Sequence, residues 1–335
     1  MLTSELFTIL PDYVCTPDGM AIDRAGRLIL SCPNYADDRL SGCVVRIDHD
    51  LKVEKWFDVP VHPETGIARN MGIALDDEGR IYLCDNQGWS GKSELQEKGR
   101  VLCLMVTEEG VIEKCEVVAD GMEHPNGIRI RNGAMYVTQS CLPRVPGPDG
   151  KLISCVYRFA LEERNVHITN TLADANILST FVTENPKCQY GVDGIVFDRE
   201  GHLLIGNFGD GQVVRLTLSE DGTKEIGREI YAQDWSQLES TDGMIMDDAG
   251  NLYIADFSAN AICRVSPDGR AERIAQSPDC RGADGGLDQP GEPILWNGVL
   301  IASCFDNVVG EGKVNLKHDM PAALVQLRIG EVEDP

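Results

Sequence analysis

Acidic and amide side chains recur at one position of a repeated sequence unit, directly before a glycine or proline. They are Asp18, Asn126, Asp193, Asp242 and Glu292. The unit that starts at residue 70 has Met71 at this position, with Asn70 one place earlier. Oxygen ligands without sulfur or a histidine cluster suit calcium, and less tightly magnesium or manganese. If the repeats converge on one axis, these residues form a candidate metal site.

An ordinary structural role must be weighed against this hypothesis, because Asp-Gly and Asn-Gly pairs are common in turns. Each unit, however, already has a second Asp or Asn at its turn, such as Asp198. The first position also varies in residue type while mostly keeping an oxygen donor. Four carboxylates near one axis would repel one another, so either a cation lies there or some pKa values rise.

The repeated unit itself predicts a β-hairpin. In GVDGIVFDREGHLLIGN (191–207), two short apolar runs flank an Asp-x-x-Gly turn. Related units begin near residues 17, 70, 124, 241 and 291, so the steps between the six copies are 49 to 67 residues. Such a period leaves room for about four strands per copy and is typical of a propeller. We therefore predict an all-β, six-bladed β-propeller that occupies residues 1–335 as a single domain.

The two ends of the chain are expected to close the ring. Residues 2–10 and 322–330 both read as strands, and their pairing in one blade would remove exposed sheet edges. Three longer segments interrupt the repeats, at 86–99, 139–190 and 305–321. Each is either a loop that reaches a binding site or a solvent-exposed excursion. Trp89 stands in the first of them.

Composition narrows the class of protein. The formal net charge of −24 argues against nucleic-acid or anionic-membrane partners, since phosphate binding needs clustered Lys and Arg. No apolar run is long enough to span a bilayer, and the N-terminus lacks the pattern of a signal peptide. The twelve cysteines include no CxxC pair, and the six histidines show no zinc-binding spacing. We expect reduced, mostly buried cysteines in a cytoplasmic protein.

With these units in view, the chain resembles the senescence marker protein, gluconolactonase and luciferin-regenerating-enzyme family of six-bladed propellers, which includes regucalcin. The resemblance covers nearly the whole chain and is best at 191–216. It implies a divalent ion held by Asp18, Asn126 and Asp193, with Asn70 near ion and substrate. Calcium is the expected ion, with magnesium, manganese or zinc as alternatives. The family usually has Glu where this chain has Asp18, and its sugar-binding Arg and Glu have no identifiable counterpart.

The resemblance implies metal-dependent hydrolysis of a lactone, a gluconolactonase-like reaction on a small polar metabolite. The cation would polarise the carbonyl while a carboxylate activates water. Asp193 is the first candidate for this base and Asp242 the second. Asn70, His124, Glu292 and His318 are candidate substrate-binding residues, although each histidine has an ordinary polar role as its alternative. No GxSxG motif indicates a serine nucleophile.

Two other functions stay open at this point. The same site would suit hydrolysis of phosphorus esters or other esters. Alternatively, the propeller is a non-catalytic calcium-binding protein whose face binds another protein. The sequence does not define the oligomeric state.

Overall fold

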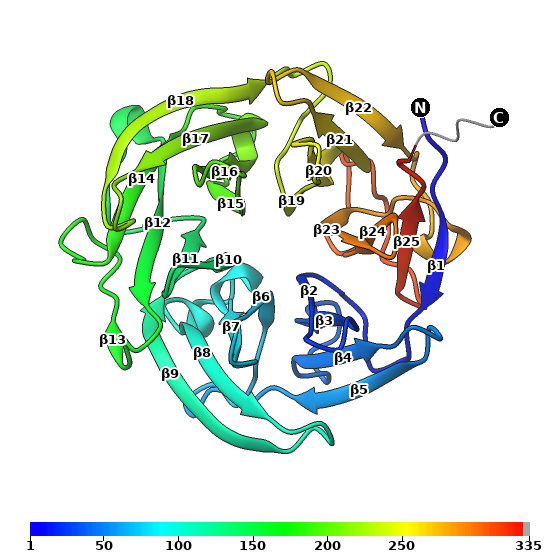
Figure 1. Ribbon diagram of the computed structural model, residues 1–335, viewed down its shortest axis with the longest axis horizontal. Helices are drawn as coiled ribbons and strands as arrows, with labels where there is room; N and C mark the ends of the chain where they lie inside the picture. The colour runs from blue at the N-terminus through cyan, green and yellow to red at the C-terminus, as the bar shows by residue number, and fades with distance from the viewer. Residues whose placement is uncertain (331–335) are drawn as a thin grey trace.

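The computed structural model describes residues 1–330, in which six four-stranded antiparallel blades surround a central channel (Figure 1). This architecture confirms the predicted six-bladed propeller. The first three blades contain β2 (Met20–Ile22), β3 (Leu28–Cys32), β4 (Cys43–Ile47) and β5 (Val53–Asp58); β6 (Asn70–Leu75), β7 (Ile81–Asp85), β8 (Gly99–Val106) and β9 (Ile112–Met122); and β10 (Pro125–Arg131), β11 (Ala134–Gln139), β12 (Leu152–Ala160) and β14 (Ile177–Thr183).

The remaining blades follow the same order from the channel outwards. They contain β15 (Val192–Phe197), β16 (Leu203–Asn207), β17 (Gln212–Leu218) and β18 (Glu225–Gln233); β19 (Met244–Met246), β20 (Leu252–Asp256), β21 (Ala261–Val265) and β22 (Ala271–Gln276); and β23 (Pro290–Trp296), β24 (Val299–Cys304), β25 (Ala323–Leu327) and β1 (Glu5–Ile9). Strand β1 pairs with β25, with Glu5 opposite Gln326. The predicted closure of the ring is therefore confirmed.

Six three-residue 3₁₀ helices lie in loops: η1 (Gly88–Ser90), η2 (Ser93–Leu95), η3 (Pro148–Gly150), η4 (Phe208–Asp210), η5 (Phe257–Ala259) and η6 (Gly282–Asp284). Within residues 1–330, none of the helices has the length and hydrophobicity that a bilayer crossing needs.

The sequence predicts the segment 139–190 as an insertion between blades, and the structure differs from this prediction. The segment contributes regular structure to the propeller, because it supplies β12 and the outer strand β14 of the third blade. It also contains β13 (Val166–His167), which adds a short parallel strand to the edge of the second blade. The pattern was missed because the chain leaves the third blade to form β13 before it returns as β14.

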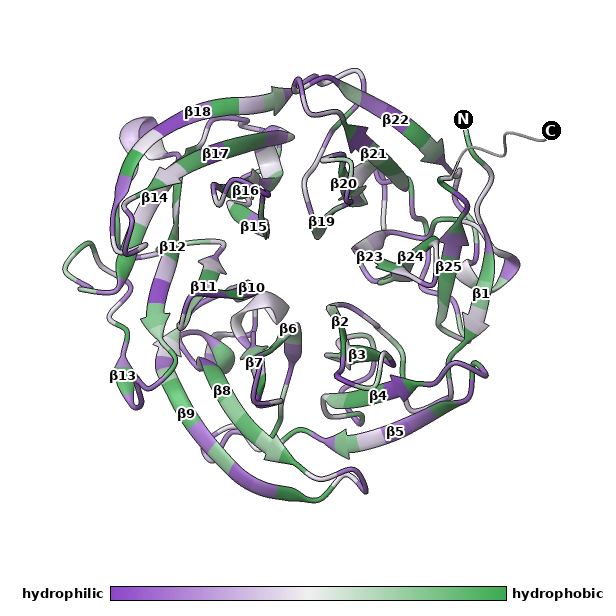
Figure 2. Cartoon of the chain, viewed as in Figure 1, coloured by the Kyte–Doolittle hydropathy of each residue, from purple (hydrophilic) through white to green (hydrophobic). Residues whose placement is uncertain are grey.

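Packing between blades explains the repeated sequence features. The second strand from the channel is almost fully buried in every blade, whereas residues of the outer strand β18 are mostly exposed or half-buried. Figure 2 shows hydrophobic and hydrophilic residues mixed along this outer strand. Arginine at the centre of β4, β17 and β21 lies opposite a glutamate of the outer strand, in the pairs Arg46–Glu54, Arg215–Glu229 and Arg264–Glu272. The repeated arginine therefore joins the third strand to the fourth.

Candidate functional site

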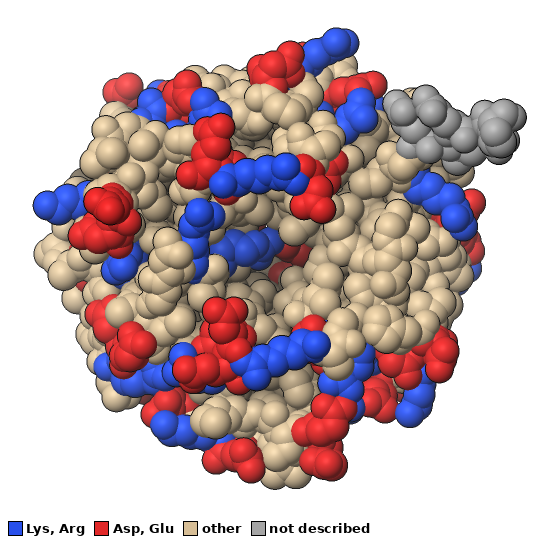
Figure 3. All heavy atoms as spheres, viewed as in Figure 1, with Lys and Arg blue, Asp and Glu red and all other residues tan. Residues whose placement is uncertain are grey.

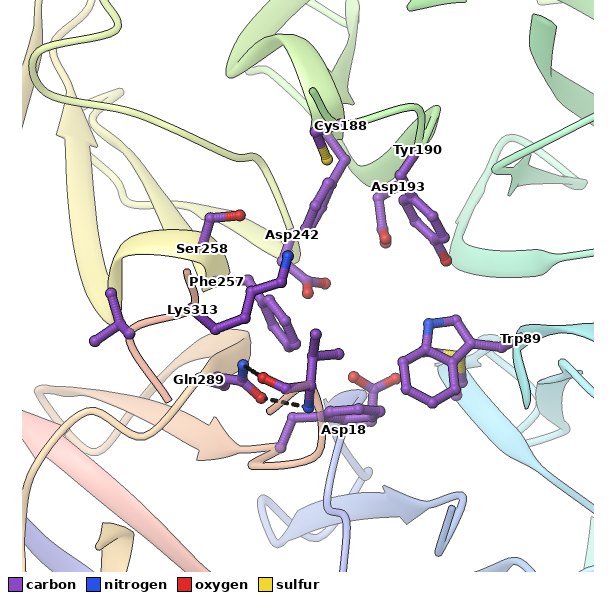
Figure 4. Close-up of a pocket in the computed structure, with 15 residues that line it drawn as sticks. Asp18, Trp89, Cys188, Tyr190, Asp193, Asp242, Phe257, Ser258, Gln289 and Lys313 are labelled. Carbon is purple, nitrogen blue, oxygen red and sulfur yellow. Dashed lines mark hydrogen bonds between the residues drawn. The ribbon is translucent and has the colours of Figure 1, made fainter. Parts of the chain in front are cut away.

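Three of the predicted ring carboxylates face one cavity at an end of the central channel. Asp18, Asp193 and Asp242 come from the first, fourth and fifth blades, and their side chains point into the same space (Figure 4). Asp18 is 6% exposed and Asp193 is 4% exposed. The cavity, counted together with the open space at its mouth, has a volume of about 650 Å³. The prediction that repeated hairpins aim oxygen atoms at one axis is thus realised for these three residues.

Glycine brings the innermost strands close enough to form this arrangement. A Cβ atom on Gly194 would lie 2.1 Å from the carbonyl oxygen of Asp242 in the next blade. A Cβ atom on Gly72 would lie 2.1 Å from the carbonyl oxygen of Asn126. Positions 72 and 194 therefore require glycine, because a side chain there would push the next blade away.

Replacement of Gly194 by alanine is expected to lower the free energy of unfolding by about 1–3 kcal/mol, because the added methyl group cannot fit without moving backbone. Chemical denaturation measures this change. Gly227→Ala in β18 is a suitable control, since the nearest atom to its Cβ would be 3.8 Å away. Equal stability of the two variants would contradict the close contact between blades.

The three carboxylates repel one another in a buried place. Burial, and then the charge of Glu292, raises the pKa of Asp18 to about 7. Burial likewise raises the pKa of Asp193 well above its ordinary value, with added repulsion from Asp18 and Glu292. Burial also raises the pKa of Asp242 well above its ordinary value, and Asp193 is the charged neighbour that adds most to this effect. Each carboxylate is therefore costly to ionise unless positive charge is supplied.

The protein itself supplies little of that charge. Among residues 1–330, no Lys, Arg or His forms an ion pair with Asp18, Asp193 or Asp242. The only side-chain hydrogen bond recorded for these three is the one that Asp242 Oδ1 accepts from the backbone N–H of Gly243, at 3.0 Å. Buried carboxylates with free oxygen atoms are a donor set that suits a hard divalent cation. The residues present therefore fit the predicted ion.

Glu292, the fourth ring carboxylate, has a different environment. Its Oε1 accepts a hydrogen bond from Nη2 of Arg129 at 2.6 Å, and the same nitrogen donates to the carbonyl oxygen of Met244 at 3.0 Å. Arg129 belongs to β10, so this pair joins the third, fifth and sixth blades across the channel. Burial raises the pKa of Glu292 although Arg129 acts in the opposite direction. Glu292 does not line the cavity, and we do not retain it as a substrate-binding residue.

The blades run clockwise in Figure 1 and anticlockwise in Figure 4, so the two views show opposite faces of the ring. On the face away from the cavity, the centre is hollowed, and both basic and acidic atoms surround the hollow (Figure 3). The Arg129–Glu292 pair therefore lies in a channel that has carboxylates at one end and both basic and acidic side chains around the other end.

Asn70 is turned away from the cavity. Its Nδ2 donates to Ser31 Oγ at 2.6 Å and to the carbonyl oxygen of Cys43 at 3.0 Å. Met71 lines the cavity instead. Successive side chains of a strand point in opposite directions, so only one of these two neighbours can face the channel. The structure thus gives Asn70 a role in joining the first two blades, in place of the predicted contact with substrate.

Asn126 lies next to the cavity, where its Nδ2 donates to the hydroxyl of Tyr190 at 3.4 Å. Tyr190 lines the cavity, whereas Asn126 does not. Its predicted role as a metal ligand stays a prediction.

His124 is also outside the cavity lining. Burial lowers its pKa to about 4, so the ring is neutral near pH 7. Ligand atoms of Glu123, His124 and Cys141 lie within 4.8 Å of one another. The sequence did not indicate this grouping, because Cys141 is brought to His124 only by the pairing of β10 with β11. Within residues 1–330, the buried Nδ1 of His124 has no hydrogen-bond partner, so the predicted contact of His124 with substrate stays a prediction.

His318 lies in another acidic environment. Its Nδ1 is 2.5 Å from the carbonyl oxygen of Asp306, and this residue raises the pKa of His318. The imidazole does not line the cavity. Its predicted contact with substrate is replaced by an interaction within the loop that follows β24.

Sequence reasoning did not place the residues of the cavity wall, although each of the three segments that it singled out contributes to the wall. Trp89 comes from 86–99, Cys188 and Tyr190 come from 139–190, and Phe305, Val308, Lys313 and Val314 come from 305–321. A sequence signal was available for three of the wall positions. Phenylalanine directly follows the second strand in three consecutive blades, as Phe208, Phe257 and Phe305.

Comparison with solved structures supports the fold. A gluconolactonase from Xanthomonas campestris is 14% identical, with 97% of this chain and 94% of that chain covered and a TM-score of 0.60. A luciferin-regenerating enzyme is 12% identical, with 98% and 95% covered and a TM-score of 0.65. Regucalcin from Agrobacterium tumefaciens, described as a calcium-binding protein, is 12% identical, with 97% and 93% covered and a TM-score of 0.60.

These matches confirm, at the level of fold, the resemblance predicted from the sequence. A virginiamycin B lyase from Staphylococcus aureus also matches, at 13% identity, 98% and 100% coverage and a TM-score of 0.58. The shared architecture therefore does not select one chemistry. No protein-family model and no curated protein matches the sequence.

Proposed function

We propose that this protein is a divalent-cation-dependent hydrolase of lactones or related carboxylic esters. The observation that carries the proposal is the group of three carboxylates, buried Asp18 and Asp193 and partly buried Asp242, which face one cavity without a paired cation from residues 1–330. Asp18 and Asp193 would hold the ion, with Asp242 or Asn126 completing the protein ligands. Similarity in fold to a gluconolactonase and to a calcium-binding regucalcin supports this assignment.

In the proposed reaction, water adds to the ester carbonyl carbon and the bond from this carbon to the ring oxygen breaks. A bound divalent cation supplies polarisation of the carbonyl and compensation of the negative charge that develops on its oxygen. Asp193 is the proposed base that accepts the proton of the attacking water, with Asp242 as the second candidate. The proton then passes to the ring oxygen as it leaves, which yields a hydroxy acid.

The carboxylate environment suits this role. A base works best when its pKa is near the working pH, and burial with neighbouring negative charge raises the pKa of both Asp193 and Asp242. A bound cation would lower the pKa values of Asp193 and Asp242 and keep both carboxylates ionised. Asp242 is only partly buried, so it has access to solvent for proton exchange.

A hydrolysis screen tests the proposal. Protein treated with chelator is resupplied with calcium, magnesium, manganese or zinc, and proton release is followed over lactones, carboxylic esters and phosphorus esters. We expect ion-dependent hydrolysis of at least one lactone or carboxylic ester. If only phosphorus esters were hydrolysed, the function of the site would be hydrolysis of phosphorus esters instead. Calcium binding measured by calorimetry without any hydrolysis would favour a non-catalytic propeller.

A further inference from the structure

Aromatic side chains make up a large part of the cavity wall, in contrast to the carboxylates of its floor. Five rings form what we call the aromatic collar: Trp89, Tyr190, Phe208, Phe257 and Phe305. Neighbouring rings contact one another in sequence, with centroid distances of 5.1 Å for Tyr190–Phe208, 5.9 Å for Phe208–Phe257, 5.8 Å for Phe257–Phe305 and 5.3 Å for Trp89–Phe305. The collar therefore spans successive blades, and Trp89, Tyr190 and Phe257 lie around the three carboxylates in the view of Figure 4.

Aliphatic side chains extend this wall. Met71, Val308 and Val314 also line the cavity. Met71 takes the ring position at which other blades have an oxygen donor, and it packs with Phe257 and Phe305. The space next to the carboxylates is thus apolar on the side of the second blade.

Few polar groups in the cavity wall are free to bind a substrate. Oε1 of Gln289 accepts hydrogen bonds from the backbone N–H groups of Asn307 and Val308, both at 2.9 Å, and its Nε2 donates to the carbonyl oxygen of Val308. The Tyr190 hydroxyl accepts from Asn126. Apart from the floor carboxylates, the lining side chains whose polar atom has no hydrogen-bond partner within residues 1–330 are Trp89, Cys188, Ser258 and Lys313.

The distribution of apolar and polar side chains in the cavity wall favours some types of substrate over others. An aldonolactone carries a hydroxyl on nearly every carbon, and each hydroxyl buried without a partner lowers affinity by roughly tenfold. An alkyl or aryl substituent loses no hydrogen bonds in the same place and gains from leaving water. The collar therefore favours an apolar group beside the reacting ester.

We propose that the substrate is a lactone or ester that carries an aromatic or alkyl substituent, rather than a polyhydroxylated sugar lactone. This inference rests on the proposed function for the reacting group, and the collar adds the nature of the substituent. The ester would lie over Asp18, Asp193 and Asp242, and the substituent would lie between the rings of the collar.

Three lactones with the same six-membered ring test the inference: δ-valerolactone, its 6-phenyl derivative and δ-gluconolactone. Each enzymatic kcat/KM is divided by the uncatalysed rate of the same lactone, with calcium present. We expect this quotient to be at least 50-fold higher for the phenyl derivative than for δ-valerolactone, and lowest for δ-gluconolactone. A quotient for δ-gluconolactone equal to or above that of the phenyl derivative would overturn the inference and leave the proposed hydrolase function intact.

A binding measurement separates the two proposals. The lactam analogues of the phenyl lactone and of gluconolactone resist hydrolysis, and their binding is followed by quenching of tryptophan fluorescence and by calorimetry. We expect the phenyl lactam to bind at least tenfold more tightly. This result would support the substrate class even if no lactone were hydrolysed, which would count against the proposed function alone. Equal or tighter binding of the gluconolactam would overturn the substrate class.

Variants then locate the effect in the collar. Trp89→Ala and Phe208→Ala should each reduce the preference for the phenyl lactam over unsubstituted δ-valerolactam by at least fivefold. Trp235→Ala is the matched control, because Trp235 is 49% exposed and does not line the cavity. Thermal unfolding confirms that each variant is folded. An unchanged preference in both collar variants would contradict binding of the substituent between these rings.

Discussion

Asparagine in place of Asp193 is expected to lower kcat/KM for any hydrolysed lactone by about 10³-fold or more. The variant loses a negative charge at the proposed ion site and the proposed base, while the side chain keeps its size. Calcium affinity, measured by calorimetry, should fall in the same variant. The hydrogen bond from Thr138 Oγ1 to the carbonyl oxygen of Asp193, at 2.7 Å, involves backbone and should persist.

A matched control variant shows whether the loss of any one negative charge has the same effect as the loss of the Asp193 charge. Asp77 is an exposed turn residue in the second blade, and Asp77→Asn removes the same charge from a protein with the same fold. Hydrolysis and calcium binding should be unchanged in this control. If Asp193→Asn retained more than a tenth of the activity of the unmodified protein, neither of the two roles proposed for Asp193 would hold.

Removal of divalent ions should make the stability of the protein strongly dependent on pH. The carboxyl of Asp18 has an ordinary pKa of 3.8, which the folded state raises to about 7. Between these values the folded protein retains a proton that the unfolded chain releases. The free energy of unfolding of the ion-free protein should therefore fall as pH rises from about 4 to 7, by up to about 4 kcal/mol from this group.

Calcium should reverse this loss, because the bound ion compensates the ionised carboxylates of the folded state. We expect calcium to raise the thermal midpoint more at pH 7.5 than at pH 5. Thermal unfolding with chelator and with calcium at both pH values measures the effect. Asp18→Asn should flatten the pH dependence of the ion-free protein and reduce the response to calcium. A calcium response of equal size at both pH values would contradict the proposed ion site.

The sequence predicted those features of the fold that recur in several blades. Asp-x-x-Gly turns occur in four blades, and arginines such as Arg46 and Arg215 occur at the equivalent position of three, because these blades pack in the same way. The third blade was predicted incompletely, since β13 separates β12 from β14 and belongs to a neighbouring sheet. A local pattern cannot show that a strand leaves one blade for another.

The site was predictable only where a residue occupies the repeated position and faces the channel. Asp18, Asp193 and Asp242 meet both conditions. Glu292 occupies the position but pairs with Arg129, which is 163 residues away in the sequence. The direction of Asn70 depends on contacts with Ser31 and Cys43 in another blade. Such contacts are set by tertiary packing, which periodicity in one hairpin does not specify.

The pairing of β1 with β25 has a consequence for synthesis of the chain. Residues 5–9 are synthesised before every other strand of the ring, yet their partner strand, 323–327, is synthesised after all of the others. Early blades can assemble as they appear, but the ring stays open until β25 has been made. A premature stop would leave the sixth blade without β25, so a truncated product would expose β24 and lack the strand that joins the two ends of the ring.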